Sequence, residues 1–128
     1  MCLFKLFEKK NIPEQKGWIA RTGDKEFLVD PKHFIACIDD ALTDIEEGYA
    51  EFFVLTPPNA INHIAFLQVC PAKESGFLHI EAGLAKKARN RRVKILACDH
   101  LSTGDVLDIF IAYFKDSVVD TSGWYELL

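Results

Sequence analysis

Four strand-like segments follow one another closely in the middle of this sequence, and their spacing limits the folds that the chain can adopt. They lie at about residues 49–55, 63–70, 77–82 and 92–98. Their connections are short runs of turn-forming or charged residues. A parallel crossover between two strands needs a dozen or more residues, so connections this short favour antiparallel pairing of neighbours. The sequence therefore predicts a four-stranded antiparallel meander.

A β-hairpin and a helix are predicted ahead of the meander. Segments 18–21 and 26–29 are strand-like and are joined by a Gly-Asp turn, which is typical of a hairpin. The helix is expected from about 31 to 47, because Asp30 is suited to cap its free amide groups and apolar residues then recur at helical spacing. Gly48 follows as a suitable left-handed terminator.

A second helix is predicted to begin after Leu101. Ser102 and Asp105 have the spacing of a capping box, in which each side chain bonds the backbone amide of the other residue. The helix is apolar on nearly all sides up to Phe114, which indicates burial on both sides or a subunit contact. A closing strand or tail is expected within residues 118–128.

This order of elements belongs to the α+β class, with two helices covering a mostly antiparallel sheet made of the four-stranded meander and the N-terminal hairpin. A chain of 128 residues fits one domain. We therefore expect a single domain over residues 1–128, in which residues 1–12 form an N-terminal arm.

Composition and charge exclude several classes of protein. The net charge is −4, which disfavours general attraction to nucleic acid or anionic lipid. No apolar run is long enough to span a bilayer, and the first ten residues do not read as a secretory signal. Three of the cysteines lie in apolar runs and none forms a CxxC pair, so we expect reduced thiols and a cytoplasmic location; the four are Cys2, Cys37, Cys70 and Cys98.

The common catalytic and cofactor motifs are absent from the sequence. No two glycines are closer than six residues, which excludes the P-loop and the GxGxxG dinucleotide fingerprint. No serine lies in a GxSxG nucleophile elbow. We therefore predict no catalytic residues and no cofactor.

One pattern is compatible with a metal site. If strand pairing is regular, His79 and Glu81 lie on one face of the third meander strand, and Cys98 and His100 take the same face of the fourth. These are side-chain types that zinc accepts. No ligand motif accompanies them, and a packed thiol with half-exposed histidines is the simpler interpretation, so no metal is predicted.

The clearest remaining signal is a group of carboxylates on the first predicted helix. Asp40, Asp44 and Glu47 follow one another at i, i+4 and i+7, and Asp39 and Glu46 flank them. Acidic side chains near a helix C-terminus lie next to its partial negative charge, and each forgoes about 0.3 to 1 kcal/mol. We interpret these five residues, called the acidic ridge below, as a binding surface for a basic protein. A merely solvated acidic surface is the alternative.

A basic segment lies at residues 86–94, where six cations are Lys86, Lys87, Arg89, Arg91, Arg92 and Lys94. Aromatic residues are absent from this segment. Binding of single-stranded nucleic acid usually relies on aromatic stacking, so a nucleic-acid partner is not expected.

The part of the chain from about residue 49 to 126 resembles small uncharacterised bacterial α+β domains, some of which are similar to immunity proteins of bacterial toxin systems. The resemblance is carried by Phe66-Leu67-Gln68, Leu78-His79-Ile80-Glu81, the capped helix at 101–114 and Trp124. It implies a signature of Gln68, Glu81 and Trp124 and no catalytic residue. The structural interpretation of this signature is a Gln and a Glu bonded across strands and a Trp sealing the core.

We therefore expect a non-enzymatic protein-binding domain that uses the acidic ridge to neutralise or dock a basic protein, such as a toxin. The alternative is a metal-dependent or nucleic-acid-processing enzyme using His79, Glu81, His100 and the basic segment at 86–94. A homodimer joined through the second helix is a third hypothesis.

Overall fold

The computed structural model describes residues 17–85 and 94–127. The predicted arm at 1–12 and all of the basic segment except Lys94 lie outside these residues. Seven strands form one antiparallel sheet in the order β2-β1-β3-β4-β5-β6-β7. The strands are β1 (Ile19–Thr22), β2 (Lys25–Leu28), β3 (Phe53–Thr56), β4 (Ile64–Pro71), β5 (Leu78–Leu84), β6 (Ile95–Leu101) and β7 (Tyr125–Glu126).

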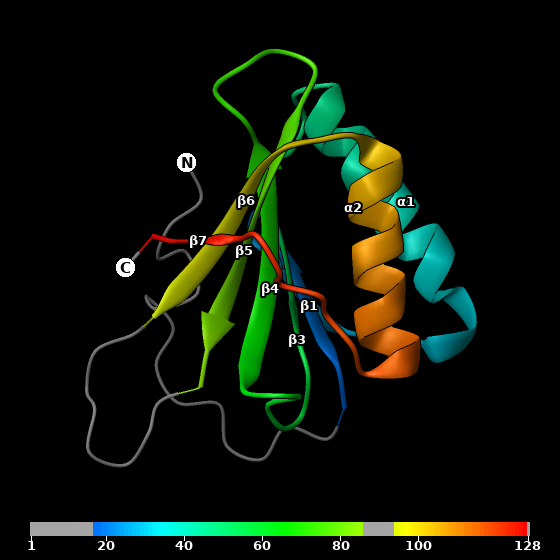
Figure 1. Ribbon diagram of the computed structural model, residues 1–128. Coiled ribbons are helices and arrows are strands. Elements are labelled where there is room, and N and C mark those ends of the chain that lie inside the picture. The colour runs from blue at the N-terminus through cyan, green and yellow to red at the C-terminus, as the bar shows by residue number, and fades with distance from the viewer. Residues whose placement is uncertain (1–16, 86–93, 128) are drawn as a thin grey trace.

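Two helices, α1 (Phe34–Glu46) and α2 (Thr103–Ile111), lie together on one face of this sheet (Figure 1). The predicted α+β class is therefore confirmed, and the hairpin is part of the same sheet because β1 also pairs with β3. No helix among the described residues is long and apolar enough to cross a membrane.

The first helix begins as the sequence indicates. The Asp30 side chain accepts a hydrogen bond from the Lys32 amide at 3.0 Å, and a single 3-10 turn, Pro31–His33, leads into α1. The residues of α1 that face the sheet are buried: Phe34, Ile38, Ala41, Leu42 and Ile45. The helical spacing of apolar side chains thus places one stripe of α1 in the core.

Strand β3, the first strand of the predicted meander, starts later than predicted. The chain is still completing the end of α1 at Tyr49 and Ala50, because both backbone amides bond the carbonyl oxygen of Asp44, at 2.8 and 3.1 Å. Strand β3 begins only at Phe53. The prediction of a strand from residue 49 was wrong here because helix termination uses these amides.

The second helix has the predicted capping box. The Asp105 amide donates to Ser102 Oγ and the Ser102 amide donates to Asp105 Oδ2, both at 3.1 Å. After α2 the chain makes a π-helical turn, Ala112–Asp116. The buried Tyr113 hydroxyl in this turn donates to the Ile64 carbonyl at 2.9 Å, which ties the end of the helix to β4.

The main core lies between the sheet and the two helices. Aromatic rings join the hairpin to both helices: Trp18 meets Tyr113 edge-on at 5.1 Å, and Phe34 stacks on Phe114 at 3.9 Å between ring centroids. Apolar side chains of α2 and of the π-helical turn that are only half-buried pack against this core, namely Leu107, Ile109, Ile111 and Phe114.

A smaller apolar cluster, formed by Phe52, Val54, Phe66 and Cys70, lies apart from the main core. Phe66 on β4 is the cross-strand partner of Gly83 on β5. A Cβ atom at residue 83 would come within 2.0 Å of the Phe66 ring, so the glycine makes room for that ring.

Candidate functional site

A continuous chain of polar side chains crosses four neighbouring strands. Tyr125 on β7 donates to Asp99 Oδ2 at 2.5 Å, and Asp99 Oδ1 lies 2.5 Å from His79 Nδ1. His79 Nε2 lies 2.8 Å from Glu81 Oε2, and Gln68 Nε2 on β4 donates to Glu81 Oε1 at 3.1 Å. These five residues are called the polar relay below.

The relay lies on the sheet face opposite the helices. Leu67 and Val69 belong to the main core, so Gln68 between them points the other way. Gln68 is the cross-strand partner of Glu81, which lies two residues from His79 on β5 and therefore shares its face. Alternation along the strands thus accounts for these three members.

Alternation along β6 brings in the fourth member, and a β-bulge follows it. Leu78 pairs with Leu101 and Ile80 with Cys98, so two residues of β6 lie opposite His79 alone. Ala97 is the cross-strand partner of Glu81, so Asp99, two residues further along β6, shares its face and lies next to His79 before the extra residue of the bulge is reached. His100, the other residue of the bulge, has a left-handed backbone with φ of 60°.

This arrangement corrects the predicted grouping of ligand-type residues. Cys98 packs against the main core on the helix side and not beside His79. His100 is exposed, and its Nδ1 lies 3.2 Å from Glu74 Oε2. No group of three or more His, Cys, Asp or Glu side chains within residues 17–85 and 94–127 is placed to hold a metal ion. The prediction assigned the wrong face of β6, because Cys98 pairs with Ile80 of the main core and Ala97 and Asp99 therefore face the relay.

The relay fixes the protonation of its members. Burial alone would lower the pKa of His79, but hydrogen bonds to Glu81 and Asp99 outweigh it and raise the pKa to about 9. Burial would raise the pKa of Asp99, yet hydrogen bonds from Tyr125 and His79 bring it below its usual value. Burial and the bond to Asp99 raise the pKa of Tyr125 to about 12.

At neutral pH His79 is therefore an imidazolium held between two carboxylates. Both ring nitrogens donate protons, to Glu81 and to Asp99, so neither is free to accept one. A histidine in this state is a poor general base. The relay is better suited to fixing the positions of four strands and of the side chains at its surface end than to acid–base chemistry.

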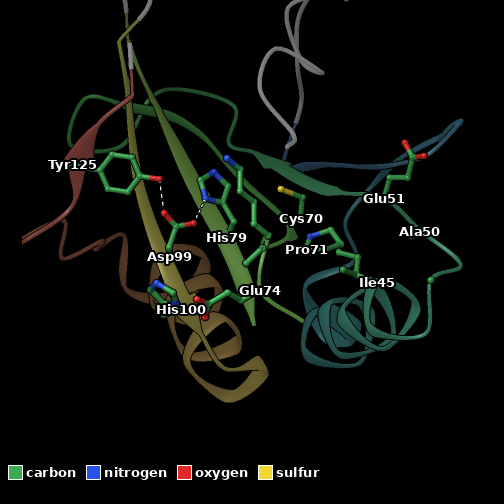
Figure 2. A pocket seen from close by; sticks show the side chains of 13 residues that line it. Ile45, Ala50, Glu51, Cys70, Pro71, Glu74, His79, Asp99, His100 and Tyr125 are labelled. Atoms are coloured by element: carbon green, nitrogen blue, oxygen red, sulfur yellow. Dashed lines mark hydrogen bonds and ion pairs between the residues drawn. The ribbon is translucent and has the colours of Figure 1, made fainter. Parts of the chain in front are cut away.

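A pocket of about 830 Å³ opens beside the surface end of the relay. Figure 2 shows His79, Asp99 and Tyr125 on one side of it, and Ile45, Ala50 and Glu51 on the other. The complete lining is Ile45, Gly48, Ala50, Glu51, Cys70, Pro71, Ala72, Lys73, Glu74, His79, Asp99, His100 and Tyr125. The pocket therefore lies between the end of α1 and strands β5 to β7.

The five residues of the acidic ridge are all exposed, and they are Asp39, Asp40, Asp44, Glu46 and Glu47. Within the two described stretches, none of them forms an ion pair with a lysine or arginine. Two neighbours of the ridge line the pocket: Ile45, which lies between Asp44 and Glu46, and Gly48, which follows Glu47. The ridge thus runs along α1 towards the pocket.

The signature residues implied by the resemblance lie in two different parts of the structure. Gln68 and Glu81 are bonded to each other across β4 and β5 and are buried. Trp124 is half-buried and packs against the main core. Sequence reasoning missed Asp99 and Tyr125 as members of the site, because it put Cys98 and His100 on the face of His79 and because the closing strand has only two residues.

Comparison of the chain with protein-family models, with curated proteins and with solved structures finds no match. The resemblance to immunity proteins therefore stays a prediction.

Proposed function

We propose that this protein is a non-enzymatic binding domain that recognises a basic protein through the acidic ridge. The observation that carries the proposal is the ridge itself, whose five carboxylates are exposed and have no intramolecular cation within the described residues. A basic surface on a partner would supply the missing charge. Complementary charge of this kind speeds encounter and selects among partners.

The position of the ridge also supports the proposal. Three of its members lie in the last turn of α1 or just beyond it, namely Asp44, Glu46 and Glu47. Here the helix dipole opposes them, so the arrangement lowers the stability of the free protein. A bound cation would offset both the repulsion between carboxylates and the unfavourable dipole, and binding would then recover that free energy.

An exposed aromatic residue adjoins the ridge. Tyr49 follows Gly48 at the end of α1 and is 80% exposed. Tyrosine is enriched among the residues that contribute most to protein–protein affinity. A tyrosine beside five carboxylates is suited to a protein partner more than to a small metal ion. A toxin with a basic surface, as the resemblance implies, is the partner class we propose.

The test is capture of a partner from the source cell, followed by binding with the purified partner. The variant Asp40→Lys/Asp44→Lys/Glu47→Lys reverses the charge of the central ridge. We expect the wild type to bind a basic protein with an affinity that falls as salt rises, and the triple variant to lose at least tenfold in affinity.

A matched control makes the same charge change elsewhere. Asp24, Asp108 and Asp116 are exposed residues of the hairpin turn, of α2 and of the π-helical turn. The triple Lys variant at these positions should bind the partner within about threefold of the wild type, since distant surface charges are screened. Equal binding by the ridge variant and the wild type would overturn the proposal.

A further inference from the structure

The pocket at the end of α1 combines an apolar wall with an acidic rim. Ile45, Ala50, Pro71 and Ala72 contribute the apolar side chains of the lining. Ile45 is 3% exposed, so this wall is part of a packed structure and not a loose surface. A ligand that fits such a wall needs an aliphatic part several atoms long.

The charged groups around the pocket are mostly negative. Glu51, Glu74 and Asp99 line it, against a single lysine, Lys73. The charge of His79 is already matched by Glu81, which lies behind it at 2.8 Å. The local balance therefore favours a positively charged ligand over an anion.

Glu51 is the carboxylate most available to a ligand. It is exposed and has no hydrogen bond or ion pair with any residue in the described part of the chain. Asp99 is held in place by His79 and Tyr125, and its side chain is 36% exposed. Each carboxylate oxygen of Asp99 accepts one bond and has capacity for another. The relay thus presents a fixed acceptor, and Glu51 adds a movable one across the pocket.

The end of α1 adds a further favourable field. Gly48, the residue that leaves the helix with φ of 81°, lines the pocket. The C-terminal end of a helix carries partial negative charge and favours a cation. The ring of Tyr125, which is 44% exposed, also offers an aromatic surface to a cationic group.

We propose that this pocket receives the side chain of a lysine or arginine from the basic partner, with the aliphatic stem against Ala50, Pro71 and Ala72 and the cationic head between Glu51 and Asp99. Lysine and arginine combine an aliphatic stem with a charged head. The inference rests on the proposed function and adds to it: the ridge attracts the partner, and the pocket anchors one residue of it.

The test uses the full-length protein and two small probes, Nα-acetyl-arginine amide and Nα-acetyl-lysine amide, followed by nuclear magnetic resonance. We expect saturable chemical-shift changes of the backbone amides of Glu51, Asp99 and Tyr125 with at least one probe. Nα-acetyl-citrulline amide, which has nearly the shape of the arginine probe but no charge, should leave them unchanged. Binding of the citrulline probe with equal affinity, or no saturable change with either cation, would overturn the inference.

A conservative variant ties the binding to the pocket. Glu51→Gln removes one charge and should weaken the better probe about two- to fivefold, as expected for an exposed ion pair. Asp116→Asn makes the same charge change in the π-helical turn, at the opposite end of β4 from the pocket, and should leave the affinity unchanged. Unchanged affinity in Glu51→Gln would overturn the inference.

Failure of this inference is distinguishable from failure of the proposed function. Ala72→Phe places a large side chain in the pocket lining. If the folded variant binds the purified partner as the wild type does while the ridge variant does not, the ridge function stands and the anchoring inference is wrong. Loss of partner affinity in both variants supports the inference.

Discussion

His79 Nε2 lies 2.8 Å from Glu81 Oε2, two residues along the same strand, and both side chains are almost completely buried. Burying a charged pair costs desolvation free energy that good geometry and further hydrogen bonds only partly offset. Here Asp99 and Gln68 supply those further bonds at the two ends of the pair. Changing the protonation of His79 or replacing either residue should therefore alter the free energy of unfolding strongly, and the first two predictions concern this pair.

The first prediction is that the stability contributed by His79 declines at alkaline pH. Its pKa of about 9 in the folded state lies above the ordinary histidine value of 6.5. A raised pKa means that this contribution, on the order of 3 kcal/mol, is fully present below pH 6.5 and is lost as pH rises through 9. Denaturant unfolding of the wild type and of His79→Gln between pH 6 and 10 measures it, and the difference in free energy should shrink over this range.

Direct titration provides the control for that prediction. The imidazole carbon-bound protons of His79 should titrate near pH 9 by nuclear magnetic resonance. His63 is exposed and gives an internal comparison in the same sample. A midpoint for His79 at or below 6.5 would contradict the assignment of an imidazolium between two carboxylates.

The second prediction concerns removal of one partner or both. Glu81→Leu leaves the buried imidazolium without its Nε2 acceptor and should lower the free energy of unfolding by about 3 to 5 kcal/mol. The double variant His79→Phe/Glu81→Leu leaves no buried charge from the pair. Its loss in free energy of unfolding should be smaller than the sum of the losses in the two single variants, by about 1 kcal/mol or more. Additive effects would show that the two side chains are not coupled.

The third prediction concerns the contact between Gly83 and Phe66. Gly83→Ala puts a methyl group where the Phe66 ring lies, at 2.0 Å from Cε1, and should cost about 1 to 3 kcal/mol of stability. In a Phe66→Leu background the same substitution should cost much less, since the ring is gone. Equal costs in the two backgrounds would mean that the strand conformation, and not the ring, requires glycine.

The fourth prediction is that reversing charge at the end of α1 stabilises the free protein. Asp44→Lys and Glu47→Lys replace an acidic side chain by a basic one near the helix C-terminus, and each should raise the free energy of unfolding by about 0.3 to 1 kcal/mol. Asp108→Lys, within α2, serves as a comparison. A loss of stability in both ridge variants would show that these carboxylates have a structural role.

Much of the fold was predictable because its signals are local. The capping box of Ser102 and Asp105 and the N-cap at Asp30 require only a few neighbouring residues, and the structure has both. The antiparallel meander followed from the short connections. The late start of β3 at Phe53 was not predictable, because it depends on the amides of Tyr49 and Ala50 completing the preceding helix.

The members of the site on β4 and β5 were predictable, and those on β6 and β7 were not. His79 and Glu81 lie two residues apart on β5 and therefore point to one face of the sheet. Gln68 joins them because it is the cross-strand partner of Glu81. Asp99 follows from the same alternation, since Ala97 pairs with Glu81, but the register of β6 against β5 could not be derived from the sequence. The sequence therefore indicates that His79 and Glu81 lie together and names the wrong neighbours for them on β6.

The π-helical turn, Ala112–Asp116, makes chain length critical where a helix end usually tolerates change. Such a turn closes on the fifth residue and holds one more residue than an α-helical turn. It lets Tyr113 reach the Ile64 carbonyl while the next residue, Phe114, stacks on Phe34. Deleting Ala112, which precedes both rings, would turn them by about 100° around the helix axis and away from their contacts. Natural variation at this residue should therefore consist of replacements and not of gaps.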